Sequence, residues 1–251
     1  IQEAINAASD GDTIFVYNGT YGPIVVDKAL SLVGEDRDIT IIEGSPSPYY
    51  YGTVSVLVSS VNISGFTIRN SLYSGISLGR IVSDITVSDN FLSDCTGGIW
   101  VVNSDRIVIV NNIVTRMKGS GIDCTKATHS QIINNIITNN FGYGIVDIGP
   151  LAQVNKELVK LPTYNTICNN TITCNNIGVL LDALEDTIRN NVIAGNIKTG
   201  IEIRGDNNTV FHNSFFNKEQ VTVKWGMNIW DDGYPSGGNY WSDYTSVDFY
   251  S

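Results

Sequence analysis

The segment Asn111-Asn112-Ile113-Val114, followed by Gly121-Ile122, decides the fold because it recurs along the chain. In the next copy, Asn134-Asn135-Ile136-Ile137 precedes Gly144-Ile145. The second residue of the pair is asparagine in every copy and falls at positions 90, 112, 135, 170, 191 and 213. All but one of the intervals are 21 to 23 residues, and the exception is 35. A repeat of this length is typical of solenoid proteins.

The apolar residues of each repeat come in short β-branched runs, such as Ile107-x-Ile109 and Ile201-x-Ile203. This alternation predicts strands, and no run keeps a helical rhythm for three turns. The period is too short for two-helix repeats and lacks the leucine-rich frame. It suits one coil of a parallel β-helix, with three strands and three turns. We therefore predict an all-β fold, a parallel β-helix of about nine coils, right-handed because parallel crossovers usually are.

The repeated asparagines are expected to form a ladder inside the corner of the solenoid. A side-chain amide can bond both the turn backbone and the next asparagine in the stack. Glycine before the following strand supplies a backbone angle that a side chain opposes. Replacing Asn135 with Leu should cost roughly 1–3 kcal/mol, because neighbouring amides lose partners. An adjacent core column is predicted three residues before each ladder position: Ile109, Ile132, Ile167, Ile188 and Val210.

The continuous repeat predicts a single domain over residues 1–251, with coils at 13–225. Residues 1–12 show the apolar spacing of a short helix, which would cap the first coil. The aromatic-rich segment 226–251 would cover the last one. Segment 45–51, rich in Pro and Tyr, is expected to be an exposed loop. The long interval contains an insertion at 149–162, which is either a loop on the binding face or a tolerated surface insertion.

Composition limits the partners of the chain. Charged residues make up 16%, the net charge is −10 and the pI is about 4.5. This balance disfavours nucleic acid and anionic membranes as partners. The sequence has no apolar run long enough for a membrane span and no signal-peptide pattern. Four glycosylation sequons are consistent with an exported chain.

The chain resembles the NosD-like family of β-helices built from PbH1 repeats. The resemblance rests on Ile1-Gln2-Glu3-Ala4-Ile5, on Gly11-Asp12-Thr13-Ile14, on the Asn-Asn repeats and on the tail from Trp230 to Tyr244. The tail is especially similar to archaeal cell-surface (S-layer) members. The resemblance covers nearly the whole chain and implies an extracellular or cell-surface location. Related β-helices bind or cleave carbohydrate, one branch serves copper-site maturation of nitrous oxide reductase, and many surface members have no assigned activity.

Carboxylates are the candidate functional groups. The residue two places after each repeated glycine should face outward, which selects Trp100, Asp123 and Glu202. Asp147 and Asp182 lie on the same strands, and coils stack about 4.8 Å apart, so Asp123 and Asp147 are expected to be neighbours. The candidate catalytic residues are Asp123, Asp147, Asp182 and Glu202; the candidate ligand-binding residues are Trp100, Asp123, Asp147 and Glu202.

These acids leave three interpretations open. Paired carboxylates suit a glycosidase, the same oxygens suit a Ca²⁺ site, and acids on an acidic protein are often only solvated. Trp100 would stack on a sugar ring. We expect the main cleft to be bordered by residues 149–162 and floored by Asp123 and Asp147.

Metal and thiol chemistry has little support in the sequence. Copper sites use His, Cys or Met, but no two of His129, His212, Met117 and Met227 lie at ligand spacing. Apart from Ca²⁺, no metal or cofactor is predicted. Cys124 is expected to face the core, whereas the sequence leaves open whether Cys168 and Cys174 are bonded.

Three functional hypotheses follow. The first is an exported cell-surface module, structural or carbohydrate-interacting, with a polysaccharide or surface glycan and neighbouring surface proteins as partners. The second is a polysaccharide-active enzyme, a glycoside hydrolase or lyase. The third is a periplasmic copper-site maturation factor of the NosD type. The first is favoured, so the sequence leans against an enzyme without deciding the question.

Overall fold

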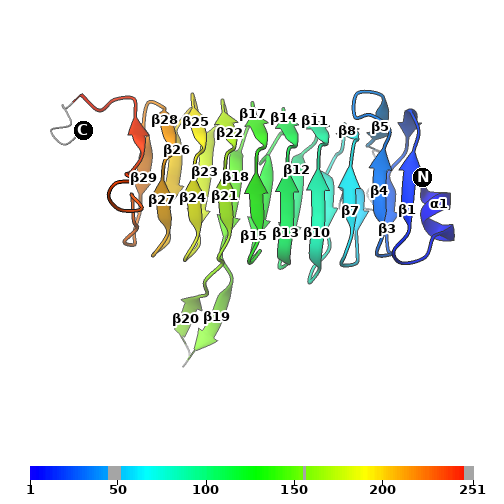
Figure 1. The fold of residues 1–251 in the computed structure, drawn as a ribbon, viewed down its shortest axis with the longest axis horizontal. Coiled ribbons are helices and arrows are strands. Elements are labelled where there is room, and N and C mark those ends of the chain that lie inside the picture. Colours follow the sequence, from blue (N-terminus) through cyan, green and yellow to red (C-terminus); the bar gives the residue numbers. More distant parts are fainter. Residues whose placement is uncertain (45–51, 155–156, 246–251) are drawn as a thin grey trace.

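The computed structural model describes residues 1–44, 52–154 and 157–245, which form a right-handed parallel β-helix of about nine turns (Figure 1). The predicted fold class and coil number are confirmed. The expected loop at 45–51 lies outside the described residues.

Three parallel sheets run along the solenoid and are called sheets A, B and C. Sheet A contains β1 (Thr13–Val16), β4 (Ser31–Gly34), β7 (Asn62–Ser64), β10 (Ser83–Ser88), β13 (Asp105–Val110), β16 (Gln131–Ile133), β21 (Thr166–Cys168), β24 (Thr187–Arg189) and β27 (Thr209–Phe211). Sheet B contains β2 (Gly19–Tyr21), β5 (Thr40–Glu43), β8 (Thr67–Arg69), β11 (Phe91–Ser93), β14 (Ile113–Thr115), β17 (Ile136–Thr138), β22 (Thr171–Thr173), β25 (Val192–Ala194), β28 (Ser214–Phe216) and β30 (Tyr240–Trp241). Sheet C contains β3 (Ile24–Val26), β6 (Gly52–Val56), β9 (Ser74–Leu78), β12 (Gly97–Val102), β15 (Ile122–Thr125), β18 (Tyr143–Ile148), β23 (Ile177–Asp182), β26 (Thr199–Ile203) and β29 (Val221–Val223).

The Asn-Asn motif forms the corner between sheets A and B, and its two residues do different work. The first residue adopts a left-handed backbone, as at Asn134 with φ 57°. The second is buried and faces inward: Asn135 accepts the backbone N–H of Asn112 at 2.9 Å and donates to the carbonyl of Ile109 at 2.8 Å. The same pattern runs from Asn90 to Asn213 and ends on Asn239 of the tail. The predicted ladder and its core column are confirmed.

Two further inward columns support the other corners. Between sheets B and C, Cys95 and Met117 are followed by the hydrogen-bonded asparagines Asn140, Asn175, Asn196 and Asn217. Between sheets C and A, the column is Ser130, Asn165, Asp186, Asn208 and Asn228. One asparagine position of this third ladder is therefore occupied by a carboxyl group.

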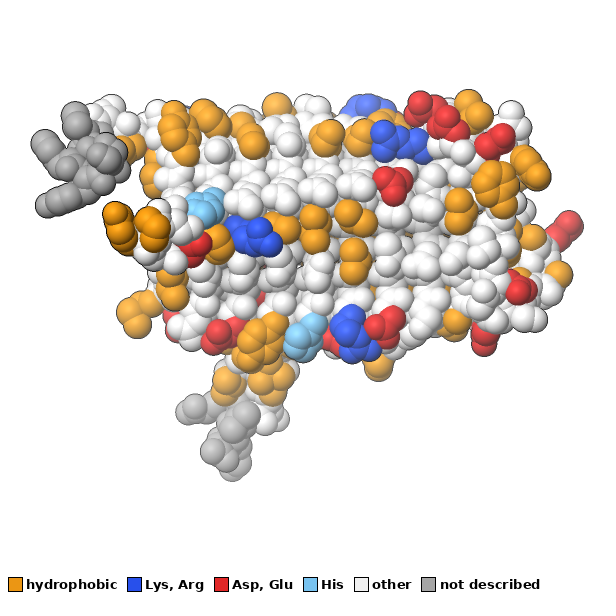
Figure 2. Space-filling model, viewed as in Figure 1, with side chains coloured by type: hydrophobic (Ala, Val, Ile, Leu, Met, Phe, Trp, Pro, Cys, Tyr) orange, Lys and Arg blue, Asp and Glu red, His pale blue; other side chains and the backbone are white. Residues whose placement is uncertain are grey.

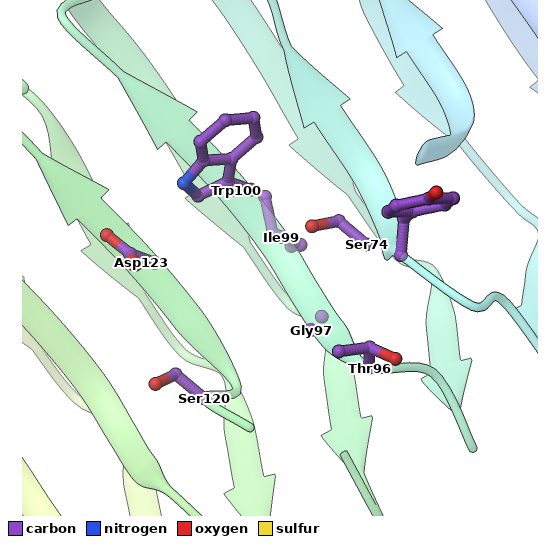
Figure 3. A pocket seen from close by; sticks show the side chains of 9 residues that line it. Ser74, Thr96, Gly97, Ile99, Trp100, Ser120 and Asp123 are labelled. Atoms are coloured by element: carbon purple, nitrogen blue, oxygen red, sulfur yellow. The ribbon is translucent and has the colours of Figure 1, made fainter. Parts of the chain in front are cut away.

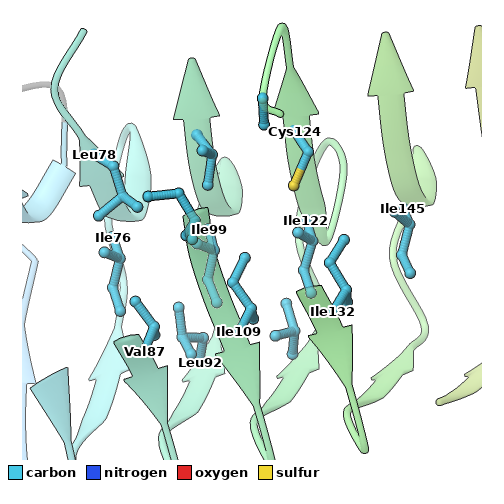
Figure 4. Close-up of a cluster of buried hydrophobic side chains, with 14 of the residues drawn as sticks. Ile76, Leu78, Val87, Leu92, Ile99, Ile109, Ile122, Cys124, Ile132 and Ile145 are labelled. Carbon is cyan, nitrogen blue, oxygen red and sulfur yellow. The ribbon is translucent and has the colours of Figure 1, made fainter. Parts of the chain in front are cut away.

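The core is a stack of aliphatic side chains enclosed by the three sheets (Figure 4). Cys124 lies in this stack, as predicted, and is 1% exposed. All four cysteines are free thiols, so Cys168 and Cys174 are not bonded; Cys168 is buried and Cys174 is exposed.

Both ends of the solenoid are covered. Helix α1 (Gln2–Ala7) lies over the first coil, and the Gln2 side chain bonds both the N–H and the carbonyl of Val25, as a neighbouring strand would. At the other end, Trp241 stacks on the core residue Phe215 with ring centroids 4.6 Å apart. These contacts explain why the terminal coils need no further strand to complete them.

The insertion after β18 is a hairpin, not an irregular loop. Its antiparallel strands are β19 (Leu151–Val154) and β20 (Glu157–Lys160), and they project away from the solenoid (Figure 1). On the face shown in the same view, charged side chains cover a minor part of the surface, in keeping with a charged fraction of 16% (Figure 2).

Candidate functional site

The candidate site lies on the outer face of sheet C. Parallel register places Ser77, Trp100, Asp123, Val146, Leu180 and Glu202 in one row across adjacent strands. These side chains face away from the core, yet Val146 and Leu180 are each only 4% exposed. The row therefore lies at the bottom of a shallow trough. Trp100 and Asp123 are more exposed than these two aliphatic side chains.

Trp100 separates two hollows on this face. One hollow, of about 300 Å³, is lined by Tyr73, Ser74, Ser120 and Asp123 together with Trp100 (Figure 3). The other, of about 410 Å³, lies between Trp100 and Arg80 and includes Ser55 and Ser77. An indole thus stands between a hollow with a carboxyl group and one with a guanidinium group, each with hydroxyl groups in its wall.

The sequence interpretation missed several of these lining residues. Ser74 and Ser120 come directly before repeated glycines, so the register of the repeat contained a usable signal for them. Arg80 follows β9 where no repeat motif marks it, and its place became clear only from the fold.

Asp123 is held in a fixed orientation by its own strand. Its carboxylate accepts the hydroxyl of Thr125 at 2.6 Å and the Thr125 backbone N–H at 3.0 Å. Burial raises the pKa of Asp123, and the two bonds from Thr125 only partly oppose that effect. The group is therefore an oriented acceptor that lines the hollow, on the strand next to that of Trp100 (Figure 3).

Asp147 does not belong to this face, and the expected Asp123–Asp147 floor is wrong. In β15 and β18, Asp123 pairs with Val146, which places Asp147 one residue further on and therefore on the opposite side of the sheet. Asp147 is 0% exposed and lies in the core row with Leu181. A one-residue offset in a strand reverses the facing of a side chain.

Asp182 and Glu202 are engaged in ion pairs. Asp182 contacts the ammonium group of Lys160 from the hairpin, which also donates to the carbonyl of Arg204 at 3.0 Å. Glu202 accepts from Arg204 at 2.7 Å and is 9% exposed. The four candidate acids are therefore not gathered, and neither a glycosidase pair nor the expected Ca²⁺ site is formed by them.

The hairpin does not wall the hollows beside Trp100. Neither hollow is lined by any residue that the structure describes within 149–162. Pro150 instead lines a separate hollow at the corner between sheets C and A, with Asp105, Arg106 and Lys126. The expected border of the cleft is therefore wrong.

The donor groups present do not fit a copper centre. His129 bonds Asp105 at 2.8 Å and stacks on Tyr164, His212 contacts the carbonyl of Ser236 at 3.0 Å, and Met117 is buried in the core. In the described part of the chain, no three His, Cys, Asp or Glu side chains are placed to share a metal ion. Copper ligation would need several such donors on one ion.

Comparisons with known proteins agree with this fold. The family described as "Right handed beta helix region" matches residues 37–148, and the family "Periplasmic copper-binding protein (NosD)" matches residues 152–246. No curated protein sequence matches at a significant level. Within the described ranges, no helix has the length and apolar character to cross a membrane.

Several solved structures share the architecture at low sequence identity. A mannuronan C-5 epimerase A-module from Azotobacter vinelandii is 15% identical, with a TM-score of 0.72 over 90% of this chain and 70% of that one. A pectate lyase is 15% identical, with a TM-score of 0.68 over 94% of this chain and 75% of that one. A DFA-IIIase from Arthrobacter chlorophenolicus is 13% identical, with a TM-score of 0.67 over 91% and 78%. At these identities the likeness shows the fold alone.

Proposed function

Since this chain belongs to the NosD-like family of right-handed parallel β-helices, we propose that it is an exported carbohydrate-binding module. The polysaccharide would lie along the outer face of sheet C, across Trp100. The observation that carries the proposal is the pair of hollows on either side of this indole. The periplasmic description of the matched family supports export, and several of the similar structures are named as polysaccharide-active proteins.

The chemistry of the face fits a sugar chain. An indole offers an apolar surface to the ring C–H groups, and the residues around it offer hydrogen bonds to hydroxyl groups. Asp123 provides an oriented acceptor, and Ser74, Ser77 and Ser120 provide hydroxyl groups. Two hollows separated by one indole match a ligand that is extended and repeats along its length.

The direct test is calorimetric titration of neutral and acidic polysaccharides into the wild-type protein and Trp100→Ala. Loss of about 1–2 kcal/mol of stacking should weaken binding roughly 5- to 30-fold. Phe15→Ala is the matched control, because Phe15 is 52% exposed but lies on sheet A. Equal affinity of all three proteins, or no binding by the wild type, would reject the sheet C face as the binding surface.

A second candidate is catalysis on the same polysaccharide. It is favoured by the raised pKa of Asp123, which suits a proton-transfer group, although none of the other candidate acids joins it. Incubation with acidic polysaccharides, followed by assays for reducing ends and unsaturated products, separates the two functions. Turnover abolished in Asp123→Asn would establish an enzyme, whereas binding without turnover supports a module.

A further inference from the structure

Two carboxyl groups that play no part in the sheet C face meet inside the solenoid. Asp147 on β18 and Asp186, which directly precedes β24, are 0% and 1% exposed. The backbone N–H of Asn165 donates to Asp186 at 2.7 Å. The amide of Asn165 also donates to Asp147, at 3.0 and 3.2 Å to its two oxygens. None of the ion pairs found among the described residues includes either carboxyl group.

The third ladder explains why this pair must hold a proton. Its asparagines use the amide NH₂ to donate to a carbonyl group: Asn165 to Ala127, and Asn208 to Ala183. Asp186 has an oxygen where its ladder neighbours have that NH₂. Its Oδ1 accepts from Thr163 and Asn165, but its Oδ2 has no donor among the N–H and O–H groups of the described residues. Because ionised carboxylates only accept, this buried oxygen can take part in a hydrogen bond only if one of the two carboxyl groups holds a proton.

The electrostatic surroundings favour retention of that proton. Burial raises the pKa of both carboxyl groups, and the charge of Asp186 raises the pKa of Asp147 further. The other titratable groups that act on Asp147 and its neighbourhood are Asp123 and Cys124 on β15, and neither brings positive charge. A second negative charge would therefore meet an apolar, acidic environment.

The pair lies at the base of the hairpin. Asp147 comes two residues before Gly149, where the chain leaves the solenoid. Thr163 and Asn165, just after the return, donate to Asp186 at 2.6 and 2.7 Å. Both ends of the insertion are thus joined through one set of hydrogen bonds, in which Asn165 contacts both carboxyl groups.

We propose that Asp147 and Asp186 form a proton-sharing latch that anchors the hairpin to the solenoid and releases it when the pair loses its proton. The direction follows from linkage. A group whose folded-state pKa is raised contributes stability that is present in acid and is lost as pH rises through that pKa. The hairpin base should therefore stay folded at acidic pH and should unfold locally at alkaline pH.

The test compares the wild type with Asp147→Asn between pH 5 and pH 9. The asparagine keeps the size of the side chain and a donor toward Asp186 but cannot lose the proton. Hydrogen exchange followed by mass spectrometry, corrected for intrinsic rates, should show residues 148–165 of the wild type opening at least tenfold more at pH 9, whereas Asp147→Asn should change far less. Residues 83–110 serve as the internal reference.

A second variant covers the case in which Asp147→Asn folds poorly. Asp186→Asn restores the amide of the neighbouring ladder positions, which can donate to an ionised Asp147. From pH 5 to pH 9, the thermal midpoint of Asp186→Asn should fall less than the thermal midpoint of the wild type, by several degrees. Equal pH dependence in the wild type and in whichever variants fold would overturn the latch.

Discussion

The inward ladder can be tested at Asn135, where every partner is known. Its side chain accepts from the backbone N–H and the amide of Asn112, and it donates toward Ile109, Ile133 and Asn170. Asn135→Leu removes all of these bonds inside a site that is 1% exposed. At minimum, the N–H of Asn112 and the carbonyl of Ile109 lose their side-chain partner without gaining water.

The magnitude follows from those two groups. Leaving a buried polar group unsatisfied costs about 1–3 kcal/mol, so the variant should lose about 2–5 kcal/mol, minus a small gain from the added apolar surface. This is larger than the range expected from sequence, because the side chain serves three coils instead of two. Urea unfolding followed by far-UV circular dichroism measures the change.

The control is Asn134→Gly, one residue earlier in the same motif. Asn134 has φ 57° and is exposed, and glycine adopts this backbone at no steric cost. Its stability should stay within about 0.5 kcal/mol of the wild type. The ladder reasoning fails if Asn135→Leu loses under about 1 kcal/mol, or if both variants lose the same amount.

Three other changes test the packing of the solenoid. Gly98→Ala should cost about 1–3 kcal/mol in urea unfolding, because a Cβ there would lie 2.1 Å from the carbonyl oxygen of Gly121. The control Gly97→Ala should cost far less, because the nearest atom to its Cβ would be a side-chain hydroxyl at 3.3 Å. Similar losses in the two variants would contradict the backbone contact at Gly98. A thiol reagent should label only Cys174 in the native protein and all four cysteines after denaturation, and rapid native labelling of a second thiol would contradict the described burial. Trp241→Ala should lower the unfolding free energy by roughly 2–4 kcal/mol because its ring covers the last core layer, and an unchanged urea midpoint would show that the tail is not a cap.

The fold could be predicted because the repeat has a separate signal for each structural task. The first residue of the Asn-Asn motif adopts the left-handed backbone, and the second is the inward asparagine of the ladder. The apolar residue three positions before that asparagine packs in the core. These demands recur in six successive coils, so one coil predicts the next.

The site was predicted less well because a shift of one residue along a strand reverses the side of the sheet that a side chain faces. The rule that selected Trp100 and Asp123 as outward also implies that Asp147 is inward, since strand side chains alternate. Grouping Asp147 with Asp123 ignored that alternation. The pairing of Asp182 with Lys160 could not have been read from sequence, because it depends on how the hairpin folds back at its base.

The spacing of the first two corners has a consequence for how such chains change in length. In five successive coils, the inward residues of these corners lie five positions apart, from Asn90 and Cys95 to Asn191 and Asn196. In these five coils, the segment that contains the sheet B strand therefore has a constant length. Every difference in coil length, including the whole hairpin, lies in the rest of the coil. That variable arc also carries the outer face of sheet C. Evolution or protein engineering can thus change the loops around this face, or insert a foreign peptide between Gly149 and Pro162, without changing the length of the sheet B segment.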